Sequence, residues 1–469
     1  MPSSARIYST TLYEEAKRLD ASFYCGPGQG ECLTFLQSKM KKKELYELTL
    51  GGQQGIFIPS RFKRVFVNSK KTGYPYLTGA GITQNDPLNN CKFLSRKYTR
   101  NVHKLLLKPK MVVVTCSGII GNPVYISEYF MGSLGSPDLL RIVPDVNKIL
   151  PGYLFAFLST TLGRALISRN TYGSVIPHIE AHHIYSTPVP VLENNIMMEI
   201  NSFIIAANFE RDKFYNTKDR FINKLFNELK IPLNNIEVFN SFSTRSVTSS
   251  QLIEVNRFKA DYFSEIAKKI EDMIQKYKHI LSRLGDVTFR IFKPPIFKRH
   301  RIEHKNGIPF MGQAEPYQLN PKPKYYLSHK QPLIQEFLLR KGMVIFPAAG
   351  STDGNFGRPL IVLDRLSGIF CGDDLMRIEA KNVNDAGYIY AYLSSSIGEV
   401  LIKRLNYGSA IPRIVPEMVS TIPIIWPNRD LRHFIGRGII DAFSNFERAA
   451  ELEDTAIGLI QKELSKWLD

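Results

Sequence analysis

The sequence predicts an α+β protein made of two tandem copies of one unit, each followed by a long helix, with the two helices packed as an antiparallel coiled coil. Three observations predict this class: an internal repeat, short apolar runs beside helical patterns in both copies, and a long amphipathic tail on each copy. A chain of 469 residues is long enough for two or more domains of ordinary size.

The internal repeat is clearest at residues 172–179 (YGSVIPHI), which return at 407–414 as YGSAIPRI with six of eight positions identical. Residues 62–64 match 297–299 in the same order and at the same offset of 235, and residues 138–142 match 374–378 at 236. Solenoid and propeller repeats have periods of roughly 20 to 50 residues, so each copy here is a whole domain. Such copies present two equivalent surfaces, or they build one larger core or a pseudo-symmetric scaffold.

Short apolar runs bounded by turn residues predict strands at 55–58, 111–115 and 343–346. Apolar residues at three- and four-residue spacing predict short packed helices at 153–168 and 388–405. Each copy therefore mixes strands and helices.

The tail of each copy, at 193–229 and 431–468, carries apolar residues on one helical face. Each helix would span roughly 55 Å and could not leave that face in water, so the two are expected to pack together. The alternative is that each folds back on its own domain. The predicted segments are 1–191, 192–236, 237–426 and 427–469, alternately a domain and a long helix with its linker.

Lysine and arginine outnumber aspartate and glutamate by 61 to 43, which gives a net charge of +18 and a pI near 9.5. This balance favours nucleic acid as a partner, and a membrane surface second. We expect no membrane partner, because the sequence has no run of about 18 apolar residues and no amphipathic stretch with one strongly basic face.

Five sparse cysteines indicate a reducing compartment, and residues 1–13 lack the apolar segment of a secretory signal, so we expect a cytoplasmic protein. Cys25 and Cys32 form the one close pair, without a matching Cys or His pair downstream. No metal site is therefore expected.

Basic residues mixed with aromatics occur at matching places in both copies and can neutralise phosphates. The repeated Tyr-Gly-Ser segments offer an aromatic ring, a flexible backbone and a hydroxyl to a phosphate or a base edge, or they are tight structural turns. The candidate DNA-binding residues are Lys63, Arg64, Lys92, Arg96, Lys97, Arg100, Tyr172, Gly173 and Ser174 in the first copy and Lys298, Arg299, Arg301, Lys322, Lys324, Tyr407, Gly408 and Ser409 in the second.

No catalytic residue is predicted. The Pro-Pro pair at 294–295 lacks the preceding Asp or Asn of an amino-methyltransferase, and the sequence has no phosphate-binding loop of the Gly-x-x-x-x-Gly-Lys-Ser/Thr type. Asp374, Glu379 and Lys381 superficially match nuclease acids and a lysine, but the first copy does not repeat them. His182 and His183 are absent from the second copy.

The order of these motifs resembles the specificity subunits of type I restriction-modification enzymes over nearly the whole chain. The resemblance rests on the repeated Gly-Ser-x-Ile-Pro-x-Ile segments, the following 188–190 (PVP) and 423–425 (PII), the segments 114–118 (VTCSG) and 345–350 (IFPAAG), and the two tails.

The resemblance implies a non-catalytic phage-defence protein with two target-recognition domains that read a split site in double-stranded DNA. It also implies two methyltransferase (M) subunits and a restriction/translocase (R) subunit as partners. S-adenosylmethionine, ATP and Mg²⁺ would belong to those partners, and this chain would bind no cofactor. The copies depart from each other at their start, where the second is expected to form a helix at 260–281 and the first has GPGQG at 26–30.

Three other functions fit the sequence less well: a DNA-recognition module of a related phage-defence or methylation system with different partners, a stand-alone nuclease, and a scaffold without DNA contact.

Overall fold

The computed structural model describes residues 28–89, 91–169, 171, 177–233, 244–255, 257–303, 306–331 and 333–468. The chain divides into two compact units, the first formed by Met1–Asp212 with Arg448–Asp469 and the second by Lys213–Glu447. Both units contain helices and strands, so the predicted α+β class is confirmed.

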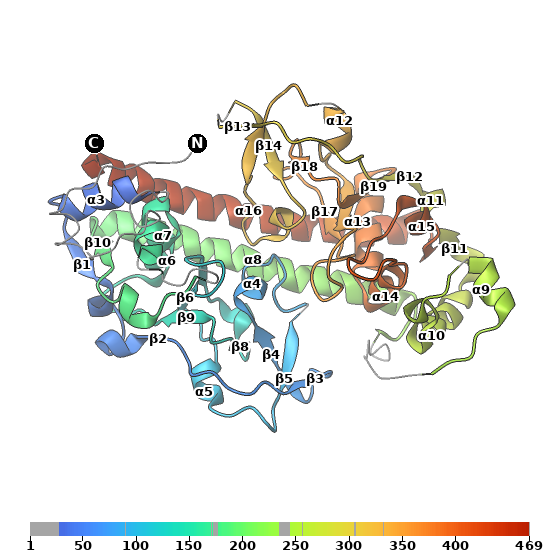
Figure 1. Cartoon of the computed structure of the whole chain (residues 1–469), viewed down its shortest axis with the longest axis horizontal. Helices are drawn as coiled ribbons and strands as arrows, with labels where there is room; N and C mark the ends of the chain where they lie inside the picture. Colours follow the sequence, from blue (N-terminus) through green and yellow to red (C-terminus); the bar gives the residue numbers. More distant parts are fainter. Residues whose placement is uncertain are drawn as a thin grey trace. The chain divides into compact units, whose positions relative to one another are not determined.

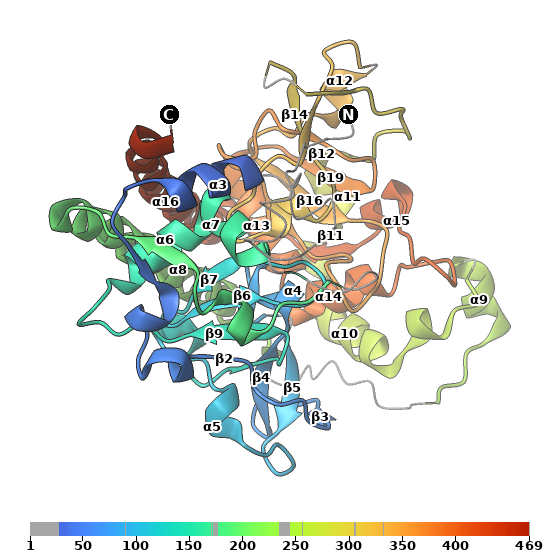
Figure 2. The ribbon, with the colours of Figure 1, turned by 60° about the vertical axis from the view of Figure 1, so that its left-hand side comes forward.

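Within the described residues, the same set of sheets occurs once in each unit. The first unit has a two-stranded sheet β1-β10, a sheet of order β2-β9-β6-β7 and a sheet of order β3-β5-β4-β8; the second has β11-β20, β12-β19-β16-β17 and β13-β15-β14-β18. Among the described strands, the pairings are antiparallel except those of β4 with β8 and of β14 with β18, which are parallel. The duplicated sequence thus folds as two copies of one topology (Figures 1 and 2).

We call the sheet that contains β6 or β16 the core sheet and the sheet that contains β4 or β14 the aromatic sheet. The strands of the first unit are β1 (Lys42–Glu44), β2 (Ile56–Phe57), β3 (Phe66–Val67), β4 (Gly73–Leu77), β5 (Lys92–Ser95), β6 (Val112–Thr115), β7 (Pro123–Tyr125), β8 (Leu134–Gly135), β9 (Leu139–Ile142) and β10 (Pro188–Pro190). Those of the second are β11 (Leu281–Arg283), β12 (Thr288–Phe292), β13 (Arg301–Ile302), β14 (Ile308–Met311), β15 (Tyr325–Leu327), β16 (Met343–Pro347), β17 (Leu360–Ile361), β18 (Phe370–Cys371), β19 (Leu375–Ala380) and β20 (Pro423–Ile425). The expected strands near 56, 112 and 343 are confirmed as β2, β6 and β16.

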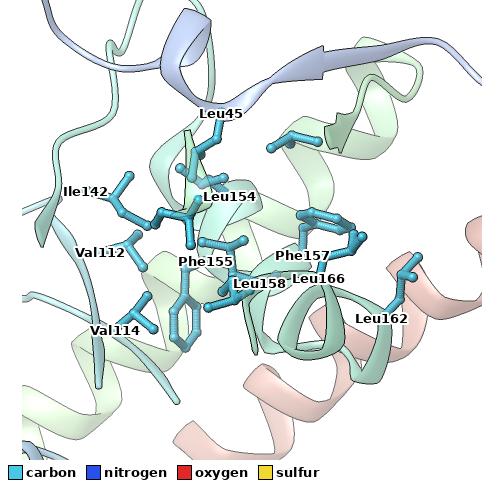
Figure 3. Close-up of a cluster of buried hydrophobic side chains, with 14 of the residues drawn as sticks. Leu45, Val112, Val114, Ile142, Leu154, Phe155, Phe157, Leu158, Leu162 and Leu166 are labelled. Carbon is cyan, nitrogen blue, oxygen red and sulfur yellow. The ribbon is translucent and has the colours of Figure 1, made fainter. Parts of the chain in front are cut away.

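A buried helix covers each core sheet: α6 (Pro151–Ser159) in the first unit and α13 (Val383–Leu393) in the second. Figure 3 shows Leu154 and Phe155 of α6 on the side of Val112 and Val114 of β6, whereas Phe157 lies near Leu166 of the next helix. This cluster of buried aliphatic and aromatic side chains is the core of the first unit.

The predicted helices at 153–168 and 388–405 are each two helices, because a second helix with its own cap begins inside the pattern. α7 (Thr161–Ser168) and α14 (Ser396–Lys403) follow directly on α6 and α13. The hydroxyl of Thr160 accepts the N–H of Gly163 at 2.9 Å, and that of Ser395 accepts the N–H of Gly398 at 3.2 Å. A Cβ at either glycine would collide with the backbone of the preceding helix, so this turn requires glycine.

The two predicted long helices are confirmed as α8 (Asn194–Glu228) and α16 (Arg429–Leu468). In the first unit, Arg211 of α8 forms a 2.8 Å ion pair with Glu453 of α16. In the second, the ring of Phe214 on α8 lies 5.0 Å from that of Phe443 on α16. Each long helix contributes residues to both units, because the unit boundaries fall inside α8 and α16. The division into four segments, with each long helix separate from the domains, stays a prediction. Among the described helices, none has the length and apolarity needed to cross a membrane.

The two copies open alike, contrary to expectation. The predicted helix at 260–281 is wrong in extent: it is a 3-10 turn (Ala260–Phe263), helix α10 (Glu265–Gln275) and a second 3-10 turn (Lys278–Ile280). The first copy also has a helix, α3 (Gln29–Gln37), which contacts α7 as α10 contacts α14. Gly28 lies directly before α3 and has a left-handed φ of 80°, a conformation that favours glycine.

Short helices complete the described elements. They are α4 (Gly79–Ile82), α5 (Val102–Leu105), α9 (Ser249–Val255), α11 (Leu284–Val287), α12 (Ile334–Phe337) and α15 (Pro416–Ser420), with 3-10 turns at Leu45–Leu48, Gly52–Gly55, Glu128–Phe130, Ala181–Ile184 and Glu315–Tyr317.

A fully buried arginine joins the two larger sheets of each unit. Arg141 of β9 donates from Nη2 to the carbonyl of Gly135 on β8 at 2.6 Å, and Arg377 of β19 donates from Nη2 to the carbonyl of Cys371 on β18 at 2.9 Å. Since β8 belongs to the aromatic sheet and β9 to the core sheet, the guanidinium holds the aromatic sheet in a defined position on the core.

The crossing of the buried helix with the long helix differs between the copies. In the first unit, the N–H of Gly152 donates to the side-chain oxygen of Asn201 at 2.9 Å. At the corresponding crossing in the second unit, Gly387 and Gly436 face each other, and a Cβ on Gly387 would collide with the backbone of Gly436. The second crossing is therefore a direct backbone contact.

Candidate nucleic-acid interface

The aromatic sheet of the first unit carries the predicted basic residues above its rings. The pairs, with the distance from the cation to the ring centre, are Arg96 over Tyr74 (4.2 Å), Arg64 over Tyr76 (5.6 Å) and Lys92 over Phe66 (5.8 Å). A cation held over a ring loses part of its rotamer freedom before any ligand arrives. All three basic side chains remain exposed to solvent, where a polyanion could reach them.

The second unit repeats this arrangement on its own aromatic sheet. Arg301 of β13 lies 4.3 Å from the ring centre of Tyr325 on β15, and Arg299 lies 5.2 Å from that of Phe310 on β14. Both arginines are exposed. The sequence predicted the clusters but not that they stand on equivalent sheets.

The other predicted basic residues are exposed in connections that border the aromatic sheets. Lys63 precedes β3, Lys97 and Arg100 follow β5, Lys298 precedes β13, and Lys322 and Lys324 precede β15. Lys324 lies 3.7 Å from Glu315, so part of its charge is already balanced. The structure thus brings the predicted basic residues of each copy to one sheet and its borders.

Aspartates in the β8–β9 and β18–β19 connections meet these basic residues, and the sequence did not predict this role. Arg64 lies 3.8 Å from Asp138, Arg299 lies 4.0 Å from Asp373, and Lys293 lies 3.6 Å from Asp374. The match between residues 138–142 and 374–378 was the sequence signal that could have pointed to Asp138 and Asp374. An exposed arginine paired with a carboxylate can exchange it for a phosphate at little cost, because exposed ion pairs contribute little stability.

The Tyr-Gly-Ser segments are described in the second unit alone; Tyr172, Gly173 and Ser174 lie outside the described residues. Tyr407 and Arg413 exchange two backbone hydrogen bonds, of 2.9 and 2.8 Å, which close the loop between them. Gly408 has a φ of 85° within this loop, a conformation that favours glycine. Tyr407 is 40% exposed and Ser409 is exposed, so both side chains are accessible at the loop.

The end of the repeated segment is attached in the same way in both units. It binds the residues that follow β6 or β16 through two equivalent backbone hydrogen bonds. These are Ile179 N–H to Cys116 O (3.1 Å) and Gly118 N–H to Pro177 O (3.2 Å) in the first unit, and Ile414 N–H to Ala348 O (2.9 Å) and Gly350 N–H to Pro412 O (3.1 Å) in the second.

A pocket of about 370 Å³ lies at this junction in the first unit. Its polar lining includes Arg61, Ser117, Asp138, His178, Glu180 and His182. The segment that ends the repeat and the β8–β9 connection therefore converge on one place with Arg61, two residues before the predicted Lys63.

The polar lining of this pocket offers both hydrogen-bond donors and acceptors. Burial, and next the charge of Asp138, raise the pKa of the Cys116 thiol to about 12, so it is protonated and a weak nucleophile at neutral pH. Nδ1 of His182 lies 3.4 Å from a carboxylate oxygen of Glu180. Among the described residues, no three His, Cys, Asp or Glu side chains are arranged to hold a metal ion.

Neither the protein-family models nor the curated proteins contain a match to this chain. Solved structures do. The chain is similar to the type I restriction-modification system S subunit from M. genitalium, with 14% identity over 92% of this chain and 96% of that chain and a TM-score of 0.37. It is also similar to the HsdS subunit from Thermoanaerobacter tengcongensis, with 14% identity over 90% and 95% of the two chains and a TM-score of 0.27.

A third similar chain comes from a structure on complex assembly and conformational transition of the type I R-M system, with 13% identity, coverage of 90% and 97%, and a TM-score of 0.28. TM-scores this low do not establish a common arrangement of the whole chain.

Proposed function

We propose that this chain is the non-catalytic DNA-specificity subunit of a type I restriction-modification complex. The observation that supports this function most is the occurrence, in both units, of an aromatic sheet with arginines held over its rings. Phosphate contacts from such residues give affinity, and side chains at the neighbouring junction would read base edges. A net charge of +18 supports a polyanionic partner.

Each unit then acts as one target-recognition domain for one half of a bipartite site. Half-sites read by two equivalent domains lie about one turn of B-DNA apart, roughly 34 Å, or more. In this proposal α8 and α16 form the antiparallel coiled-coil spacer, and contacts such as Arg211 with Glu453 and Phe214 with Phe443 support it. The domains are 1–191 and 237–426, and the spacer segments are 192–236 and 427–469.

The partners proposed are double-stranded DNA, two methyltransferase subunits and a restriction/translocase subunit, acting in the cytoplasm in defence against phage. S-adenosylmethionine, ATP and Mg²⁺ belong to those partners, where they supply methyl transfer and DNA translocation. This chain contributes the choice of site.

A mobility-shift titration of the full chain with its methyltransferase partner tests the proposal at two salt concentrations. A complex that contacts six phosphates loses about 10³-fold in affinity between 50 and 200 mM salt. Binding that is absent, or that does not change with salt, would contradict a phosphate-binding function. Selection from random double-stranded DNA should in addition yield two half-sites at a constant spacing, whereas a single continuous site would contradict the two-domain reading.

A further inference from the structure

The repeated segment differs between the units at one chemically important position. Residues 172–179 (YGSVIPHI) and 407–414 (YGSAIPRI) exchange valine for alanine at the fourth position and histidine for arginine at the seventh. The first exchange changes size alone. The second, His178 against Arg413, replaces an imidazole by a guanidinium.

The backbone presents these two residues in the same way. His178 forms an antiparallel β-bridge with Ser117, and Arg413 forms the equivalent bridge with Ala349. The residue before each accepts, and the residue after each donates, one of the matched hydrogen bonds to the strand end described above. The two side chains therefore start from equivalent positions, and their difference is chemical.

The surroundings of this position are those of the candidate interface. His178 lines the pocket together with Asp138, which Arg64 of the aromatic sheet approaches to 3.8 Å. Arg413 is exposed and is paired through its backbone with the exposed Tyr407. In each unit this residue thus lies at, or next to, the side chains that would contact DNA.

We infer that His178 and Arg413 are base-contacting residues through which the two units read different bases. A guanidinium offers two parallel N–H donors, which match the O6 and N7 acceptors of guanine. A neutral imidazole has one donor and one acceptor and cannot make that pair of bonds. The second unit should therefore require guanine at the position that Arg413 contacts, and the first unit should not require it at the equivalent position. This inference rests on the proposed function.

The experiment is selection of double-stranded DNA from a random pool by the full chain in complex with its methyltransferase partner, followed by sequencing. Arg413→His should lower the preference for guanine at one position of one half-site by roughly 5- to 150-fold and leave the other half-site unchanged. His178→Arg should introduce a guanine preference at the equivalent position of the other half-site. Arg448→His, at an exposed arginine of α16, is the matched control and should change neither.

Arg413→Lys keeps the charge but replaces the rigid pair of donors by a flexible ammonium, so it should retain affinity with a weaker preference for guanine. This variant keeps the inference testable if Arg413→His folds poorly, which a thermal unfolding curve would reveal. Variants that bind more weakly with unchanged base preferences would overturn the inference, because they would mark both residues as phosphate contacts. A wild-type complex that selects no sequence would instead refute the proposed function, and the inference with it.

Discussion

Replacement of Glu453 by methionine should destabilise the first unit strongly, because the buried side chain of Arg211 depends on its carboxylate. Nη2 of Arg211 lies 2.8 Å from the carboxylate of Glu453, and the two side chains are only 6% and 10% exposed. Burial lowers the pKa of Arg164, and the charge of Glu453 opposes this. Glu453→Met therefore leaves the guanidinium of Arg211 in a poorly solvated place without the Glu453 carboxylate.

The magnitude follows from the distance and the burial. Unit charges 2.8 Å apart attract by about 6 kcal/mol at an effective dielectric of about 20. Desolvation cancels much of this in the intact pair, but loss of one partner of a buried pair costs about 3–5 kcal/mol. We expect this loss for Glu453→Met and a smaller one for Arg211→Met, since Arg164 remains near the carboxylate in that variant. The double variant should be more stable than Glu453→Met alone, because the apolar pair contains no buried charge without a counterion.

Urea unfolding of the full chain, followed by circular dichroism, measures these differences, and a double-mutant cycle isolates the coupling. The pair Arg448 and Glu451 on α16 is the control: its atoms lie 3.6 Å apart, but its side chains are 63% and 61% exposed. Removal of either control residue should change stability by at most about 0.5 kcal/mol. Additive effects of Arg211→Met and Glu453→Met, with a coupling below about 0.5 kcal/mol, would refute the role assigned to the buried pair.

Three further predictions follow from the structure. Gly398→Ala should lower the free energy of unfolding by about 1–3 kcal/mol in thermal unfolding, because the new Cβ would collide with backbone atoms. Gly458→Ala on α16 has open space around the new Cβ and should leave stability unchanged or raise it. Burial raises the pKa of Glu447 above its usual 4.5, so the folded protein binds this proton more tightly than the unfolded chain, and the carboxyl's contribution to stability falls as pH rises above 4.5. Glu447→Gln should therefore gain stability relative to wild type between pH 4.5 and 7 in urea titrations; a constant difference would contradict this. Lys63→Ala with Arg64→Ala should weaken binding at one half-site in a mobility-shift assay with half-site competitors, and equal loss at both would show that the units do not bind independently.

The long helices and the duplication could be predicted because their signals are local and extended. An amphipathic pattern of many turns is hard to mistake for a strand, and a repeat at constant offset survives divergence of single residues. The split of each short helix pair was also encoded locally, in Thr160 and Ser395 three residues before a glycine, but the apolar spacing concealed it.

The interface could be predicted in its residue types but not in its geometry. The strands of the aromatic sheet are two to five residues long and too short to show an alternating pattern. The partner of Arg64 is Asp138, which comes far later in the chain, so tertiary folding alone brings the two together. The sequence did not predict a helix near the start of the first copy, because the glycines at 26–30 argue against the helix that begins at Gln29.

The unequal helix crossings restrict how the two units could be recombined. A chimaera with asparagine from the first crossing at position 436 would place side-chain atoms where a Cβ already collides with the backbone of Asn384. The reverse exchange, glycine at position 201, would remove the acceptor of the Gly152 N–H. A chimaera should therefore fold when each globular segment is transferred together with the first turns of its own long helix. It should not fold when the junction separates the globular segment from those turns.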